Sequence, residues 1–245
     1  MAAPRGAINS DCMPESVLFL PGLLCDTRLW RDQIAALSDI AHATVADLTR
    51  DDSVDDMARH ALQGMPDRFA LCGLSMGGYV ALALMRLAPD RVTRLCLMDT
   101  SARPDSEEQA RRRRGLIAMT RAHRFRGVTP RLLPMLIHPA RQTDTALTQE
   151  VMDMAERVGR DAFLRQQNAI LHRPDSRPHL PAINVPTRVA VGSDDQLTPP
   201  DHAREIAAGI PGAILHVVSN SGHLPPMERP DEVSEILRDW LAEAL

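Results

Sequence analysis

The chain contains 245 residues with a formal net charge of −4, 44% hydrophobic residues and 24% charged residues. These proportions are those of a folded globular protein rather than a disordered one, and the negative balance argues against a protein that binds nucleic acid. All 28 basic residues are arginine, which excludes every mechanism that needs a lysine, such as a Schiff base or a phosphate-loop lysine.

The cysteines and the apolar runs predict neither a metal site nor a membrane span. The spacings between the four cysteines fit no zinc or redox motif. The longest nearly apolar stretch, residues 17–25, is too short to cross a membrane, and residues 1–16 lack the apolar segment of a secretory signal. We therefore expect a cytoplasmic protein that binds neither membrane nor nucleic acid.

Short apolar runs alternate with helical patterns along most of the chain. The runs that we expect to be strands are residues 17–20, 43–45, 68–72, 94–98, 187–191 and 214–218. Their lack of strict polar alternation is typical of strands buried on both faces. Because helical patterns separate them, we predict an α/β protein with a mainly parallel sheet and helices on both faces.

The helical patterns fill the intervals between these runs. We expect helices at residues 29–37, 53–62, 76–88, 201–208 and 233–241. Between residues 101 and 180 there is no clear strand pattern, and apolar residues recur at broadly helical spacing. We interpret residues 101–180 as a helical insertion in a core formed by residues 17–100 and 181–245, preceded by a loose N-terminal tail, residues 1–16.

The sharpest chemical signal is the segment Gly-Leu-Ser-Met-Gly-Gly at residues 73–78. It lies between a predicted strand and a predicted helix, which is the context that a nucleophile elbow requires. The glycines of such a turn relieve clashes with neighbouring backbone, and Ser75 projects beside a helix N-terminus that favours negative charge. The alternative is a glycine-rich turn with an exposed serine, and the flanking strand and helix favour the elbow.

A serine nucleophile needs a base and an acid, which follow this type of elbow in the order Ser, acid, His. His223 lies in the segment Ser-Gly-His-Leu-Pro-Pro after the last predicted strand, and it is the best candidate base of nine histidines. The acid should follow the fifth predicted strand, where Asp194 and Asp195 are adjacent. Spacing does not choose between them, and Asp99 at the end of the fourth predicted strand is a third candidate.

Two backbone N–H groups are expected to form an oxyanion hole, which would stabilise the negative charge of a tetrahedral intermediate. One is the N–H of Met76, which follows the nucleophile. The other should come from the loop after the first strand, Pro-Gly-Leu-Leu at residues 21–24, and we select the N–H of Leu23.

Two further clusters give weaker signals. The spacing of His172, Asp175 and His179 fits no known metal site, so we expect no metal ion, and no residue pattern calls for a cofactor. The run Arg111–Arg114 could clamp an anionic substrate. Because four consecutive side chains point all round a helix, we prefer to interpret this run as a solvated helix face paired with nearby glutamates.

Four segments together resemble the α/β-hydrolase superfamily, namely GLSMGG, LPGLLCDTRLW, VGSDDQLTPP and NSGHLPPMERPDEV. The similarity runs from about Val17 to the C-terminus, and the chain is most similar to small bacterial esterases, enol-lactonases and C–C bond hydrolases. The resemblance implies the α/β-hydrolase fold with a helical cap at residues 101–180. It also selects Asp195 as the acid, because these families place the acid three residues after the glycine that closes its strand. One departure is the first loop, which begins Pro-Gly where the family commonly has His-Gly.

The sequence therefore predicts a serine hydrolase that cleaves a small carboxylic ester or lactone through an acyl-enzyme on Ser75. His223 would be the general base and Asp195 its orienting acid, and the N–H groups of Leu23 and Met76 would hold the oxyanion. The alternative enzyme is a C–C bond hydrolase or thioesterase of the same fold. An alternative from another class is a ligand receptor that keeps the triad with negligible turnover. The oligomeric state stays open.

Overall fold

A computed structural model describes residues 14–123 and 125–244, and its centre is a six-stranded parallel sheet. The strand order is β2-β1-β3-β4-β5-β6, and every neighbouring pair is parallel. The strands are β1 (Glu15–Leu20), β2 (Ala41–Val45), β3 (Phe69–Leu74), β4 (Val92–Met98), β5 (Thr187–Gly192) and β6 (Ile214–Val218). The predicted sheet is confirmed, and each strand overlaps one predicted run. The predicted N-terminal tail lies mostly outside the described residues, and its last two residues belong to β1.

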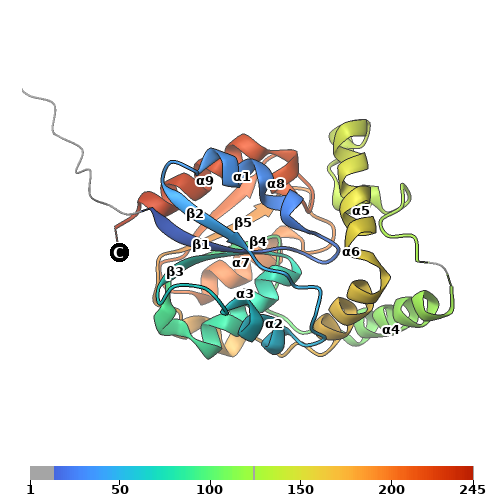
Figure 1. Ribbon diagram of the computed structural model, residues 1–245, viewed down its shortest axis with the longest axis horizontal. Helices are drawn as coiled ribbons and strands as arrows, with labels where there is room; N and C mark the ends of the chain where they lie inside the picture. The colour runs from blue at the N-terminus through green and yellow to red at the C-terminus, as the bar shows by residue number, and fades with distance from the viewer. Residues whose placement is uncertain (1–13, 124, 245) are drawn as a thin grey trace, which may run out of the picture.

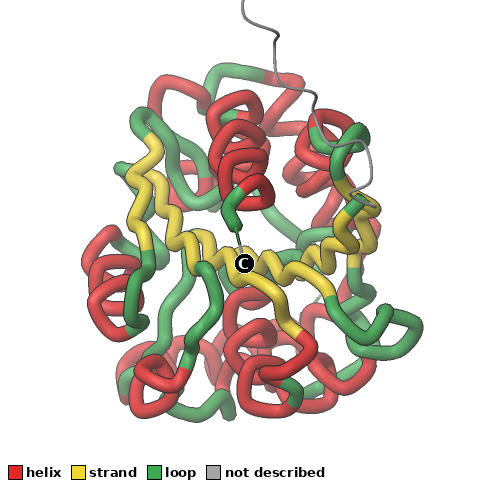
Figure 2. The backbone as a smooth tube through the Cα atoms, turned by 90° about the vertical axis from the view of Figure 1, so that its left-hand side faces the viewer, coloured by secondary structure: helices red, strands yellow, loops and turns green. Residues whose placement is uncertain are grey.

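Helices cover both faces of this sheet. One layer consists of α1 (Arg31–Ala36), α8 (Pro225–Glu228) and α9 (Pro230–Ala242), with a short 3₁₀ helix at Thr27–Trp30 before α1 (Figure 1). The other layer consists of α2 (Val54–Ala61), α3 (Met76–Leu87) and α7 (Pro200–Gly209). Figure 2 shows the strands between the two helical layers. The helix predictions in this part of the chain are confirmed, and α8 is an additional short helix in the loop after β6.

The alternation of side chains along each strand divides the apolar residues between two cores. In β1, Leu18 and Leu20 pack with residues of α2, α3 and α7, whereas Val17 and Phe19 pack with residues of α1 and α9. Each fully buried large apolar side chain contributes about 1.5–3 kcal/mol relative to exposure. The two cores therefore hold both helical layers against the sheet and fix where the strands end.

The segment between β4 and β5 is helical. It contains α4 (Glu107–Ala122), α5 (Leu133–Leu136), α6 (Thr145–Leu171) and 3₁₀ turns at Pro139–Arg141 and Arg177–Ala182. These helices lie beside one end of the sheet, at the right of Figure 1. Ser106 starts α4 with a capping box to Gln109, and Gly159, at φ +79°, bends α6. The described part of this segment has no strand, as predicted, and its limits as a separate cap stay a prediction.

Within residues 14–123 and 125–244, no helix combines the length and the apolar character that crossing a bilayer requires.

Candidate active site

Ser75 occupies the tight turn between β3 and α3. Its backbone has φ +54° and ψ −114°, a conformation that costs energy for a residue with a side chain. Hydrogen bonds on both sides hold it there: the N–H of Ser75 donates to the carbonyl of Met98 at 2.9 Å, and the hydroxyl of Thr100 donates to the carbonyl of Ser75 at 2.7 Å. The strain and its compensation fit a residue that the fold holds in one orientation.

The glycines around Ser75 are required by close backbone contacts. A Cβ on Gly73 would lie 2.4 Å from the carbonyl oxygen of Gly77, and a Cβ on Gly77 would lie 2.1 Å from that of Leu20. A Cβ on Gly78 would lie 2.3 Å from the hydroxyl of Thr100. The structure thus gives the physical reason for the glycine pattern of residues 73–78.

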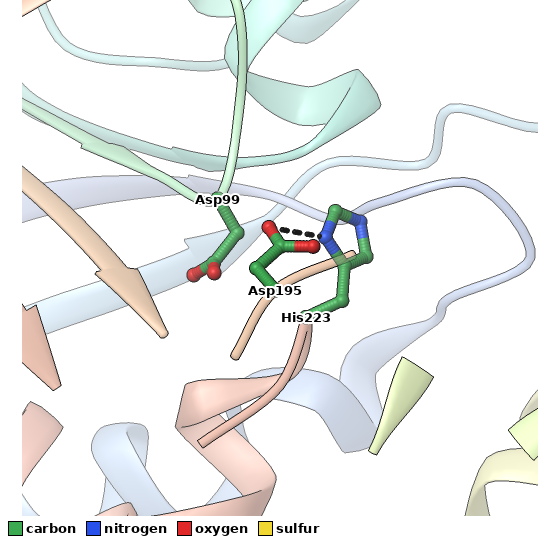
Figure 3. Close-up of side chains that lie close together, drawn as sticks. All are labelled: Asp99, Asp195 and His223. Carbon is green, nitrogen blue, oxygen red and sulfur yellow. Dashed lines mark hydrogen bonds and ion pairs between the residues drawn. The ribbon is translucent and has the colours of Figure 1, made fainter. Parts of the chain in front are cut away.

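Ser75 and two residues that the sequence places far away form a continuous hydrogen-bond chain. The hydroxyl of Ser75 lies 2.8 Å from Nε2 of His223, and Nδ1 of His223 lies 2.8 Å from Oδ2 of Asp195. Figure 3 shows the carboxyl group of Asp195 bonded to His223. The neighbouring Asp194 is half exposed, and its carboxylate lies near Nε2 of His138, at 3.5 Å. The structure therefore brings Asp195, and not Asp194, to His223.

The surroundings of Asp195 favour its charged form. Burial by itself would raise the pKa of Asp195, but the positive charge and hydrogen bond of His223 and the hydrogen bonds of Thr198 outweigh it, so the pKa is lowered. The hydroxyl of Thr198 donates to Oδ2 at 2.6 Å, and the N–H groups of Leu197 and Thr198 donate to Oδ1 at 2.8 and 3.1 Å. A carboxylate held in this way can fix the tautomer of His223 and stabilise its imidazolium form.

Asp99, the third acid candidate, lies beside the pair without taking the place of Asp195 (Figure 3). It is fully buried, has φ +43°, and accepts a hydrogen bond from the N–H of Gly192 at 2.8 Å. Burial and, next, the charge of Asp195 raise the pKa of Asp99 well above its usual value. The sequence offered Asp99 as a third candidate acid, and only the structure places its carboxyl group beside Asp195 and away from a hydrogen bond with His223.

Asp99, Asp195 and His223 are also the only described group of three metal-type ligands whose atoms lie within 4.8 Å of one another. His172, Asp175 and His179 form no such group in the same part of the chain. The hydrogen bonds that join Asp195, His223, Ser75 and Thr198 account for the close approach of Asp195 and His223 in this group.

A buried glutamate that was not selected from the sequence holds the loop of His223. The carboxylate of Glu228, in α8, accepts hydrogen bonds from the N–H groups of His138, Gly222 and Leu224 at 2.7, 2.8 and 3.3 Å. Burial raises the pKa of Glu228. The Glu of the ending GHLPPME was a signal for this residue, but its role needs the folded loop to be recognised.

The two predicted oxyanion donors belong to residues near Ser75: Met76 follows it in the chain, and Leu23 lines both cavities with it. Within the described residues, the N–H groups of Leu23 and Met76 donate to no protein acceptor. A Cβ on Gly22 would lie 3.5 Å from Cβ of Ser75, so the loop passes directly against the elbow. This geometry is compatible with the predicted oxyanion hole, which stays a prediction.

Gln166 of α6 holds this loop from the other side. Its side-chain oxygen accepts a hydrogen bond from the N–H of Leu24 at 3.1 Å, and its side-chain NH₂ donates to the carbonyl of Leu48 at 3.1 Å. Gln166 is fully buried, and Leu24 has φ +59°. This contact supports the loop that lacks the histidine common in the family, and nothing in the sequence near the loop pointed to a glutamine more than 140 positions away.

Two cavities meet at Ser75. The larger has a volume of about 820 Å³ and extends along Tyr79 and the start of α4. The smaller, about 80 Å³, is lined mainly by apolar side chains and contains Leu23 and His223. A cavity of the larger size suits a small organic molecule. Ser75 thus faces two spaces of different size and polarity.

The parallel sheet and the site at the ends of its strands can be compared with known protein families. Residues 17–236 match the model of the alpha/beta hydrolase family, so the chain belongs to that family. The predicted fold is confirmed by this match and by the solved structures below.

Similar proteins are hydrolases with several kinds of substrate. The structure of a thermophilic esterase from Thermogutta terrifontis, bound to malate, is 30% identical and superimposes with a TM-score of 0.85 over 93% of this chain and 89% of that one. The enol-lactonase of Burkholderia xenovorans LB400 has a TM-score of 0.85 at 23% identity, covering 96% and 94% of the two chains, and shows the common fold. A 2-hydroxy-6-oxononadienedioate/2-hydroxy-6-oxononatrienedioate hydrolase of Paraburkholderia phymatum is 27% identical over 78% of this chain and 70% of its own length.

Proposed function

We propose that the protein is a serine hydrolase that cleaves a carboxylic ester or lactone of a small molecule. The observation that carries the proposal is the chain of two 2.8 Å contacts from Ser75 through His223 to Asp195. In this role, His223 accepts the proton of the Ser75 hydroxyl as the oxygen attacks the carbonyl carbon. Asp195 keeps the proton on Nδ1 of His223, so that Nε2 is free to act as the base.

The remaining steps use the same groups. The N–H groups of Leu23 and Met76 stabilise the oxyanion of the tetrahedral intermediate. The protonated His223 then gives its proton to the leaving alkoxide, which leaves an acyl group on Ser75. Water attacks this acyl-enzyme with His223 again as the base, and the carboxylic acid is released.

Ester cleavage is supported by the similarity to the Thermogutta terrifontis esterase, which is the most identical of the solved structures named above. C–C bond hydrolysis is the second candidate, and the Paraburkholderia phymatum relative favours it. The two activities separate by the bond that is cleaved: a C–C bond hydrolase splits a carbon–carbon bond, and an esterase releases an alcohol from a simple ester.

The test combines turnover with covalent labelling. We expect the protein to hydrolyse p-nitrophenyl acetate and butyrate over many turnovers, and a fluorophosphonate to label Ser75, located by mass spectrometry. The Ser75→Ala variant should keep its circular dichroism spectrum and lose both properties. A label elsewhere, or undiminished turnover by Ser75→Ala, would contradict the proposal. One burst without further turnover would instead favour a receptor that keeps the triad.

A further inference from the structure

The larger cavity has a wall of guanidinium groups facing the same space as Ser75. Among the described residues that line it, five are arginine and one, Asp105, is acidic. The arginines are Arg103, Arg112, Arg113, Arg173 and Arg177. They come from the start of the segment after β4, from α4, from the loop just after α6 and from the 3₁₀ helix Arg177–Ala182, so this wall is assembled by tertiary structure.

At the centre of the wall, two arginines share one carboxylate. Nε of Arg113 lies 2.7 Å from Oδ2 of Asp105, and Nη1 of Arg173 lies 2.7 Å from Oδ1 of the same group. The side chains of Asp105 and Arg173 are 3% and 6% exposed, and that of Arg113 is 20% exposed. The hydrogen bonds and charges of both arginines outweigh burial and lower the pKa of Asp105, so it is ionised. The group therefore carries one uncompensated positive charge in a largely buried place.

This positive group lines the same cavity as Ser75 and packs on the helix that follows it. The guanidinium of Arg173 stacks over the ring of Tyr79, with 4.3 Å between its carbon and the ring centroid. Tyr79 is four positions after Ser75, about one helical turn along α3. Nη2 of Arg173 has no hydrogen-bond acceptor within the described part of the protein, although Nε has one acceptor and Nη1 has two. The two N–H groups of Nη2 on a buried cation are thus left for a ligand.

The other three arginines contribute less. Arg103 and Arg177 are paired with Glu205, and Arg177 is also paired with Asp175. Arg112 is 70% exposed and lies 3.9 Å from Glu108. Solvent and these acids weaken the field of exposed guanidinium groups. The part of the wall that can bind a ligand specifically is therefore Arg113 and Arg173, with the carboxylate of Asp105 between them. We name this group the arginine pair.

We propose that the larger cavity selects substrates that carry a carboxylate, and that the arginine pair binds this group while Ser75 attacks an ester elsewhere in the molecule. The proposal rests on the proposed function and names its substrate class. A carboxylate matches the planar donor arrangement of a guanidinium and neutralises the buried charge. The smaller cavity, which is lined mainly by apolar side chains, would take a smaller apolar group on the other side of the ester.

The test measures binding to the Ser75→Ala variant, in which no ester is cleaved. The probes are the monoethyl esters of succinate, glutarate and adipate, each compared by titration calorimetry with the matching ester that has a primary amide in place of the carboxylate. At least one carboxylate should bind about tenfold more tightly than its amide, since a hydrogen bond to a charged group contributes about 1.5–3 kcal/mol. Equal affinities within all three pairs would overturn the proposal.

Substitutions of single arginines test which residues cause the preference for the carboxylate. Arg113→Gln and Arg173→Gln, added to Ser75→Ala, should each abolish most of the preference for the carboxylate. Arg173→Lys should keep part of it, because charge remains but the fork of donors is lost. Arg111→Gln, next to these residues on α4 but exposed and outside the cavity, is the matched control and should keep the preference. If Arg173→Gln fails to fold, Arg113→Gln decides alone, and an unchanged preference there contradicts the assignment.

The two proposals can fail separately. If the carboxylate preference is found but the native protein releases no ethanol from any of the monoethyl esters, the arginine pair stands and the serine hydrolase proposal fails. If p-nitrophenyl acetate is turned over through Ser75 but the calorimetric preference is missing, the hydrolase proposal stands and the carboxylate site fails.

Discussion

Two regions of the molecule are built in different ways. One is the corner of the sheet where Ser75, Asp195 and His223 meet, and the other is the helical segment after β4. At the corner, each candidate side chain follows directly on a strand end or sits in a short loop after one, and its hydrogen bonds join groups fixed by the parallel sheet. In the helical segment, the arginine pair joins Asp105, α4 and the loop just after α6 across more than 60 positions. The proposed reacting groups therefore follow local motifs, whereas the proposed carboxylate site depends on how separate helices meet.

The two regions also differ in how completely their apolar side chains are buried. The strands β3, β4 and β5 are buried along their whole length. By contrast, Leu116, Met119, Leu132 and Met135 of the helical segment are large apolar side chains that remain exposed, and Met135 and Leu116 line the larger cavity. A wall with exposed apolar and methionine side chains can adapt to a ligand, while a fully packed sheet keeps the reacting atoms in place.

The largest expected effect tests the corner. Asp195→Asn should lower kcat/KM for p-nitrophenyl acetate by about 10⁴-fold, because the amide donates where the carboxylate accepts and leaves His223 in the wrong tautomer. Asp194→Asn is the matched control and should stay within about threefold of the native protein, since Asp194 is half exposed and does not contact His223. Steady-state kinetics of both variants measures this. The reverse order of effects would show that the acid is misassigned.

A smaller effect is expected where the helical segment supports the corner. Gln166→Met keeps the length of the side chain but removes the acceptor for the N–H of Leu24. We expect kcat to fall about tenfold with a smaller change in KM, because a displaced oxyanion donor weakens transition-state binding more than substrate binding. Asn168→Ala, which removes an exposed contact of α6 to the carbonyl of Asp52, is the control. If both variants behave alike, α6 does not support the oxyanion loop.

The smallest expected effect is on the free energy of unfolding and comes from the buried Asp99. Its pKa is raised in the folded protein, so between the pKa of the unfolded chain and the folded value the native state holds more protons. The contribution of Asp99 to the free energy of unfolding is therefore fully present below about pH 4. It is lost as the pH rises towards the folded pKa, by at most about 1.4 kcal/mol per pH unit. Asp195, whose pKa is lowered, acts in the opposite direction and loses its contribution as the pH falls.

Denaturant unfolding of Asp99→Asn between pH 4 and 8 measures this contribution. The amide is neutral at every pH and keeps an oxygen for the N–H of Gly192. The free energy of unfolding of the variant, relative to the native protein, should therefore increase with pH. A pH-independent difference would mean that Asp99 has an ordinary pKa and that the corner carries two carboxylate charges near neutrality.

Much of the corner could be predicted because its signals are local. The glycines of residues 73–78 predict Ser75 by steric necessity, and strand ends of a parallel sheet meet at one edge, which brings Asp195 and His223 to the serine. The choice of Asp195 over Asp194 came from the family resemblance, since adjacent aspartates have the same chemistry. Thr198 was missed as the hydroxyl donor to Asp195, because a threonine in a loop has no distinctive signal.

The run Arg111–Arg114 shows the limit of local reasoning. A solvated helix face was the preferred interpretation, and Arg112 fits it with its exposed contact to Glu108. Arg113, the next residue, instead turns to Asp105 and Gln167 and lines the cavity with Arg173. The helical period separates these two side chains by about 100°, but which direction is the interior depends on where α4 packs.

The sequence by itself determined the parallel sheet, the two helical layers and the turn that presents Ser75. Apolar periodicity and the steric demands of glycine act between residues close in the chain, so they can be recognised without a structure. Only the tertiary structure decided that Asp99 is buried, that Gln166 holds the loop of Leu23, and that Arg113 and Arg173 share one carboxylate. Burial, charge balance and long-range hydrogen bonds depend on distances across the fold, which no spacing in the sequence encodes.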